Sequence, residues 1–252
     1  MLLFLKHILM IKKIVRFFVP VLCIVFSSDV IYAQDSLNSY HSVPEKNVAP
    51  QNPNPRYLKP VTLIVPGALL LYGGLKPVIN AIPKIDSTIY TRVKQNYPDF
   101  HTNAADYLTW VPSASVYVLD AFHVKTAHSF KQHLILDAGS LLIAGGIGYG
   151  MRLITKNNKV YNSFGTDFPS GHTTNAFRGA EILHQELKAT KPWLSYSGYL
   201  VATGVGLMRI YDKDHVLSEV LAGAGLGIIS TKLTYWVFDK VENKRNTNQN
   251  QL

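Results

Sequence analysis

Side chains suited to phosphate chemistry lie close together in the second half of the chain. Residues 169–172 read Pro-Ser-Gly-His, where an extended loop is expected to become a helix. The backbone N–H groups of Ser170 and Gly171 would be unpaired donors at the positive end of that helix, which favours anion binding. His172 follows directly, and Arg209 and His215 come about 40 residues later. A cation, a nucleophile or base, and a proton donor are the groups that a phosphomonoesterase needs.

A second pair reinforces this interpretation. His215 and Glu219 are four residues apart, so they share one face of a helix. The carboxylate can then fix the tautomer of the ring and leave its other nitrogen free to attack phosphorus. Taken alone, such a pair is more often structural. Arg152, and Lys159 in the loop after it, add cations that we expect to converge on the same anion.

Six apolar segments of near-uniform length follow residue 58, each long enough for a helix and too long for a typical strand. They span residues 61–75, 107–124, 133–154, 173–187, 194–211 and 216–237. The fourth carries four charged or titratable side chains and must face protein or water on one side. We therefore predict an all-α, six-helix bundle over residues 58–240.

The glycine-rich run at residues 222–227 does not fit a dinucleotide-binding loop, because no strand precedes it and its spacing is wrong. Close helix packing is the favoured interpretation. Residues 84–106 are polar and predict a surface connection or a short helix. We expect a disordered tail over residues 241–252, which are rich in Asn and Gln.

The first 34 residues are typical of a secretory signal peptide, with basic residues before an apolar run and Ala33 at a plausible cleavage site. Residues 35–57 predict a disordered linker. The single cysteine, Cys23, lies in the signal, so the mature chain would have no disulfide and no cysteine metal site.

The composition and net charge of the chain narrow the classes of molecule that it can bind. Hydrophobic residues make up 47% of the chain and charged residues only 16%, which suggests a largely buried or membrane-embedded protein. The formal charge of +9 suits anionic lipid or phosphate partners. We expect no nucleic-acid partner, because no block of basic residues is interleaved with aromatic ones.

The order of these motifs resembles the type 2 phosphatidic acid phosphatase and vanadium haloperoxidase superfamily. The resemblance rests on FPSGHTTNAF at residues 168–177 and RIYDKDHVLSEVLAGAG at residues 209–225. It implies that His215 is the nucleophile and forms a phosphohistidine, and that His172 protonates the leaving alcohol and then activates water. Glu219 would orient His215. The resemblance also implies phosphate contacts from Ser170, Gly171, Arg209, Arg152 and Lys159, and no metal ion or other cofactor.

The chain departs from the family pattern at several positions. Arg152 stands where the first motif has Lys, and Lys159-Val160 where it has Arg-Pro; we interpret this as a reciprocal exchange. Met208 replaces a serine, and Glu219 replaces an aspartate. Charge is kept, but a planar guanidinium and an ammonium differ in geometry. A weakly active or inactive relative that binds an anion or lipid therefore stays open.

The resemblance also implies a membrane-associated enzyme of the bacterial envelope that acts on a lipid phosphate, with its active site facing the periplasm. A cleaved signal followed by six crossings would instead place the site in the cytoplasm, so the count of spans and this placement disagree. A soluble periplasmic acid phosphatase acting on small phosphate esters is the alternative. A vanadium haloperoxidase is disfavoured by the short chain.

Overall fold

The computed structural model describes residues 58–249, with side chains through residue 245. Every regular element within that range is a helix. In chain order these are η2 (Pro60–Leu63), α2 (Ile64–Gly74), α3 (Ala81–Asn96), α4 (Ala104–Leu108), α5 (Val111–Ala121), α6 (Phe130–Thr155), α7 (Gly171–Leu187), α8 (Pro192–Ser195), α9 (Ser197–Tyr211) and α10 (Leu217–Gln249). The all-α prediction is confirmed for these residues. The expected signal peptide, with Cys23, and the linker lie outside them.

Each of the six predicted apolar segments contains a helix: α2, α5, α6, α7, α9 and α10. The structure adds α3, α4 and α8, so the described bundle has more helices than the six predicted. Helix α3 occupies most of the stretch that the sequence predicted as a connection or a short helix. It is amphipathic, and it buries Ile82, Asp86 and Val93.

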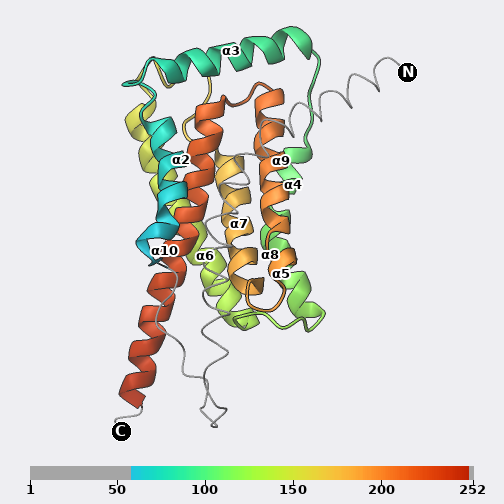
Figure 1. The fold of residues 1–252 in the computed structure, drawn as a ribbon, viewed down its shortest axis with the longest axis vertical. Coiled ribbons are helices and arrows are strands. Elements are labelled where there is room, and N and C mark those ends of the chain that lie inside the picture. The colour runs from blue at the N-terminus through green and yellow to red at the C-terminus, as the bar shows by residue number, and fades with distance from the viewer. Residues whose placement is uncertain (1–57, 250–252) are drawn as a thin grey trace, which may run out of the picture. The chain divides into compact units, whose positions relative to one another are not determined.

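Helix α7 lies at the centre of the bundle (Figure 1) and packs against α5, α6, α8, α9 and α10. Its charged side chains Arg178, Glu181 and Glu186 are buried inside protein, which is one of the two surroundings that the sequence left open. Each has a partner on another helix: Arg178 is ion-paired with Asp137 of α6, Lys232 Nζ of α10 lies 2.8 Å from Glu181 Oε1, and His133 Nε2 of α6 lies 3.0 Å from Glu186 Oε2. These pairs offset the cost of removing the charges from water.

Glycines on α10 allow its backbone to approach two neighbouring helices. A Cβ atom at Gly223 would lie 2.7 Å from the carbonyl oxygen of Ser170, which precedes α7. A Cβ atom at Gly225 would collide with the Pro66 carbonyl of α2. The prediction that this glycine run serves close helix packing is confirmed.

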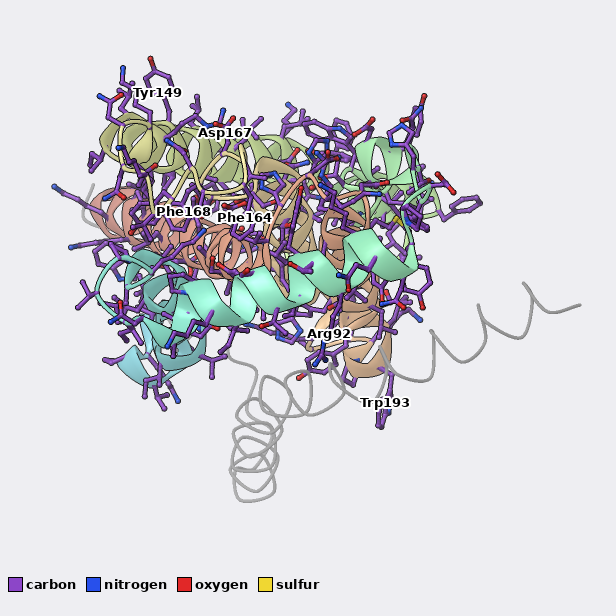
Figure 2. All side chains as sticks on the ribbon, turned by 90° about the horizontal axis from the view of Figure 1, so that it is seen from above. Arg92, Tyr149, Phe164, Asp167, Phe168 and Trp193 are labelled. Atoms are coloured by element: carbon purple, nitrogen blue, oxygen red, sulfur yellow. The ribbon has the colours of Figure 1, made fainter. Side chains whose placement is uncertain are left out.

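Helix α3 crosses the end of the bundle at which α7 and α10 begin and α9 ends (Figure 1). Figure 2 looks onto this end and shows Phe164, Asp167 and Phe168 in the loop before α7. The ring of Phe164 packs against Tyr90 of α3, with 4.8 Å between centroids. Helix α3 therefore covers the loop that carries the Pro-Ser-Gly-His motif.

Helix α10 continues to Gln249, through most of the residues expected to form a disordered tail. Glu242 accepts a hydrogen bond of 3.1 Å from Gln132 Nε2 of α6. The polar composition of this segment reflects a helix that extends beyond the apolar core, held by a contact that the local sequence does not reveal.

Candidate active site

The Pro-Ser-Gly-His motif forms the start of α7. Ser170 is its N-cap, and Gly171 is its first helical residue. The Ser170 N–H donates to the Glu219 carbonyl oxygen over 3.1 Å, so the expectation of an unpaired amide at this position is wrong. The Ser170 side chain is fully buried, with its Oγ 2.9 Å from Thr173 Oγ1. The motif thus ties the start of α7 to the start of α10.

His215 and Glu219 are joined as their spacing predicted. His215 Nδ1 lies 3.0 Å from Glu219 Oε2, and Glu219 is fully buried. The carboxylate also accepts hydrogen bonds from Thr166 Oγ1 at 2.7 Å, on Oε1, and from the Val216 N–H at 3.3 Å, on Oε2. An ionised Glu219 therefore keeps the ring proton on Nδ1 and leaves a lone pair on His215 Nε2.

An open cavity of about 600 Å³ borders the His215 member of this pair. Five of the predicted site residues line it: Arg152, Gly171, His172, Arg209 and His215. They come from the end of α6, the start of α7, the end of α9 and the segment just before α10. The structure thus brings into one cavity residues that lie more than 60 positions apart, although their catalytic and binding roles remain predictions.

Acidic side chains hold the cations at the cavity mouth. Asp106 of α4 places Oδ1 2.9 Å from His172 Nε2 and 3.7 Å from an Arg209 guanidinium nitrogen. The other terminal nitrogen of Arg209 lies 3.1 Å from Asp214. The buried Arg209 Nε has no hydrogen-bond partner within the described part of the chain. An anion in the cavity would therefore have to replace Asp106 or Asp214 at the terminal nitrogens of Arg209.

The electrostatics of His172 follow from the same contacts. Burial of the ring, and then the neighbouring Arg209 guanidinium, lower the pKa of His172 below its ordinary value, although Asp106 acts in the opposite direction. A bound phosphate dianion would oppose this lowering, because it favours the charged imidazolium. The ring is thus suited to gain a proton together with an anionic ligand.

The two residues of the exchanged first motif lie in different surroundings. Arg152 lines the cavity and is half-exposed, with a guanidinium nitrogen 3.6 Å from Asp167 Oδ2. Lys159 is exposed in the turn after α6 and is not among the residues that line the cavity. Its predicted phosphate contact therefore gains no geometric support.

Several neighbours of the site were not found from the sequence. Asp106 sits on a short helix, and the buried Lys76 and Asp86 come from the end of α2 and from α3. None belongs to a motif. Only the polar character of residues 84–106 pointed toward this region, and it predicted a surface role. Among the described residues, no group of three or more His, Cys, Asp and Glu is arranged to hold a metal ion.

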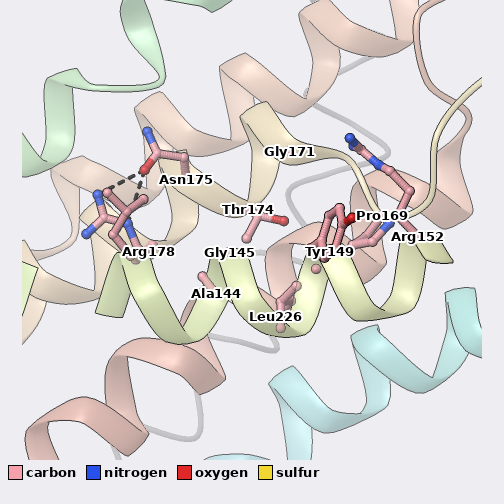
Figure 3. A pocket seen from close by; sticks show the side chains of 12 residues that line it. Ala144, Gly145, Tyr149, Arg152, Pro169, Gly171, Thr174, Asn175, Arg178 and Leu226 are labelled. Atoms are coloured by element: carbon pink, nitrogen blue, oxygen red, sulfur yellow. Dashed lines mark hydrogen bonds between the residues drawn. The ribbon is translucent and has the colours of Figure 1, made fainter. Parts of the chain in front are cut away.

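A smaller, apolar groove of about 220 Å³ continues from the cavity between α6, α7 and α10 (Figure 3). The groove and the cavity share Leu141, Arg152, Gly171 and Asn175. Between Leu141 and Arg152 along α6, and opposite them on α10, the groove is lined mainly by small or apolar residues: Ala144, Gly145, Gly148, Tyr149 and Leu226. Arg178 also lines the groove and is already bonded to Asn175 Oδ1, at 2.9 Å.

Comparisons with known proteins give the family of the chain. Residues 90–242 match the PAP2 superfamily. Over 147 residues the chain is 33% identical to a lipid A 1-phosphatase of Porphyromonas gingivalis, an alignment that covers 56% of this chain and 32% of the relative. The chain thus spans about a third of that protein's length.

Among solved structures, a transmembrane PAP2-type phosphatidylglycerolphosphate phosphatase of Bacillus subtilis matches with a TM-score of 0.40 and 20% identity. The match covers 70% of this chain and 97% of the solved one.

Proposed function

Because the chain belongs to the PAP2 superfamily, we propose that it is a metal-independent phosphomonoesterase that acts on a lipid phosphate. The observation that carries this proposal is the His215–Glu219 pair, which opens into a cavity that also holds His172 and Arg209. A nucleophile, a proton donor and a cation thus converge on one space large enough for a phosphate group.

The reaction begins when the substrate phosphate enters the cavity and takes over Arg209 and His172 from Asp106. Arg209, Arg152 and the Gly171 N–H bind its non-bridging oxygens. His215 Nε2 then attacks phosphorus, the bond from phosphorus to the alcohol oxygen breaks, and protonated His172 gives its proton to that oxygen. Positive charge that develops on the His215 ring is stabilised by Glu219.

The second half-reaction releases phosphate. Neutral His172 takes a proton from water, whose oxygen attacks phosphorus as the bond to His215 Nε2 breaks. Inorganic phosphate leaves, His215 returns to its neutral form, and His172 is again protonated. Protons balance over the cycle, and no redox partner is needed.

The groove supports a lipid substrate over a small phosphate ester. It lies along α6 beside the phosphate cavity, shares Leu141 and Arg152 with it, and has a mainly apolar lining between these two residues. A molecule with a phosphate at one end and a hydrocarbon chain at the other would fill both spaces. Burial of the chain would contribute about 0.8 kcal/mol per methylene group removed from water.

Membrane association is supported by two helices, α6 and α10, that are long and apolar enough to cross a bilayer. Only 17% of the most apolar stretch of α6 is buried in the protein, against 72% for α10. Leu142 and Ile154 of α6 are 76% and 82% exposed. Helix α6 thus presents an apolar surface that lipid would cover, next to the groove.

We place the active site on the periplasmic side of the bacterial envelope. The sequence has one cysteine, Cys23, so new cysteines can report the orientation once Cys23 is replaced by Ala. In intact cells, Lys159→Cys at the active-site end should react with a membrane-impermeant maleimide. Trp193→Cys in α8, at the opposite end and 92% exposed, should not. The reverse labelling would place the site in the cytoplasm.

The lipid assignment is tested by phosphate release in detergent without added metal. The substrates are phosphatidic acid, an isoprenyl diphosphate, lipid A and a soluble aryl phosphate, and the His215→Ala protein is the blank. Release from lipid that is absent from the blank supports the proposal. A preference for the aryl phosphate would favour a soluble-ester phosphatase, and no release would favour a binding role.

Two adjacent glycines provide a matched test of the groove. Gly145 lines the groove, whereas Gly146 is an exposed neighbour that does not, and a Cβ atom at either would meet nothing within 4 Å. Gly145→Leu should raise KM for lipid substrates tenfold or more and leave aryl phosphate hydrolysis unchanged. Gly146→Leu should change neither. Equal effects of the two variants would remove the groove from the substrate site.

A further inference from the structure

Lys76 is a buried cation behind the catalytic pair. It follows the end of α2, and none of its side chain is exposed. Its Nζ lies 3.5 Å from Asp86 Oδ2 and 3.6 Å from Glu219 Oε1, and both carboxylates are also fully buried. The Phe164 ring centroid is 5.6 Å away. Three charges from α3, α10 and the end of α2 therefore meet out of contact with water.

Such a cluster is costly unless its charges compensate one another. Removing an ammonium from water costs several kcal/mol, so this lysine requires its carboxylate partners. Conversely, two carboxylates that share one buried site cannot both stay ionised without a cation, because like charges disfavour the ionised form. Lys76 is the side chain that allows Asp86 and Glu219 to be ionised together.

Asp86 anchors the cluster to the first turn of α10. Its Oδ1 accepts a hydrogen bond from the Ser218 N–H at 3.0 Å, and its Oδ2 accepts one from Ser218 Oγ at 2.5 Å. Ser218 precedes Glu219, so this contact fixes the backbone that carries the catalytic carboxylate. The positive end of the α10 dipole also favours an ionised carboxylate at this point.

We propose that Lys76 is a positioning residue for the reaction: its ammonium pairs with Glu219 Oε1, so that Oε2 is held for His215 Nδ1. This inference rests on the proposed function. With neutral His215, one ammonium and two carboxylates give the cluster a formal charge of −1, and a positive His215 ring brings it to zero. The cluster is thus balanced for the charge that develops during attack on phosphorus.

Loss of Lys76 would leave Asp86 and Glu219 without their shared cation, and Glu219 Oε1 would lose its charged partner. Repulsion between the two buried carboxylates would then turn Glu219 away from His215 Nδ1, so the ring nitrogen that attacks phosphorus would carry the proton in part of the molecules. The expected defect is in kcat rather than KM, because Lys76 does not line the cavity.

The kinetic test combines Lys76→Met with changes in its partners. Lys76→Met should lower kcat at least a hundredfold with KM changed less than threefold. In a Glu219→Gln background the same substitution should not lower kcat further, because the carboxylate that Lys76 holds in place is already lost. The double variant Lys76→Met with Asp86→Asn restores the charge balance. Its kcat should be at least tenfold higher than that of Lys76→Met alone. Additive losses and no recovery would overturn the proposal.

Lys232→Met is the matched control, because Lys232 is also a buried lysine paired with a buried glutamate, in the core between α7 and α10. It should lower thermal stability, as Lys76→Met does, without changing kcat. An equal loss of kcat in both variants would mean that any unpaired buried glutamate disables the protein, and would also overturn the positioning role.

A second readout does not depend on turnover. In protein labelled with ¹⁵N-histidine, the His215 resonances, identified by their loss in His215→Ala, should report a proton on Nδ1. Lys76→Met should shift the ring toward a mixture of tautomers, whereas Lys232→Met should not. An unchanged tautomer refutes the inference even if no substrate is hydrolysed, and absent turnover with the expected shift refutes only the proposed function.

Discussion

Replacement of Glu219 by Gln removes the charge beneath His215 and leaves nearly the same shape. Both carboxylate oxygens are acceptors: Oε1 takes the Thr166 hydroxyl and lies near Lys76, and Oε2 faces His215 Nδ1. A glutamine has only one acceptor oxygen. Because its amide nitrogen would be repelled on the Lys76 side, we expect that nitrogen to face His215.

The resulting defect has two parts. An amide N–H aimed at Nδ1 forces the ring proton to Nε2, the nitrogen that must attack phosphorus. The lost charge adds to this, since two unit charges at the 3.0 Å separation of His215 Nδ1 and Glu219 Oε2 attract by about 5 kcal/mol at an effective dielectric constant of about 20. If half of the charge has developed in the transition state, that part alone costs about a hundredfold in rate.

Together we expect Glu219→Gln to lower kcat by about 10³- to 10⁴-fold, comparable to the loss when a carboxylate beneath another catalytic imidazole is neutralised. Phosphate release from the best lipid substrate measures kcat, and thermal unfolding confirms that the variant is folded. Glu219→Asp keeps the charge with one methylene fewer and should retain far more activity. A folded Glu219→Gln protein within tenfold of the wild-type kcat would refute the role of this carboxylate.

Three further predictions follow from the site and the core. Asp106→Asn removes the charge that raises the pKa of His172 against burial and Arg209, so that pKa falls further. The alkaline limb of kcat/KM for a lipid phosphate, which reports the protonated His172 of the free enzyme, should then move to lower pH. A move to higher pH would contradict this sign. Arg152→Ala should raise KM about tenfold while Lys159→Ala leaves it unchanged; equal effects would restore Lys159 to the site. Gly227→Leu should lower the unfolding temperature, because a Cβ atom there collides with the Thr174 carbonyl of α7, and an unchanged temperature would contradict that packing.

The elements that carry the predicted site residues were predictable because each has a local signal. Apolar segments marked the helices that became α6, α7, α9 and α10. The i,i+4 spacing placed Glu219 beside His215. The glycine run at 222–227 indicated the close contact between α10 and its neighbours, because glycine has no side chain to keep two helix backbones apart.

The residues that surround the catalytic pair have no such signal. Lys76, Asp86 and Asp106 reach the site from three separate segments, and their role depends on how α3 and α4 lie over the end of the bundle. Local sequence does not encode that arrangement. The sequence predicted only a connection or a short helix where α3 lies, because the low hydrophobicity of this stretch is typical of a loop. One face of α3 nevertheless buries Asp86 against α10.

The most direct test of the central claim is to trap the phosphoenzyme. Protein is mixed with a ³²P-labelled lipid phosphate, quenched in alkali, in which phosphohistidine survives, and digested to locate the label. We predict label on the peptide that contains His215 and none in His215→Ala. Phosphate release that persists in His215→Ala without any labelled histidine would contradict the account.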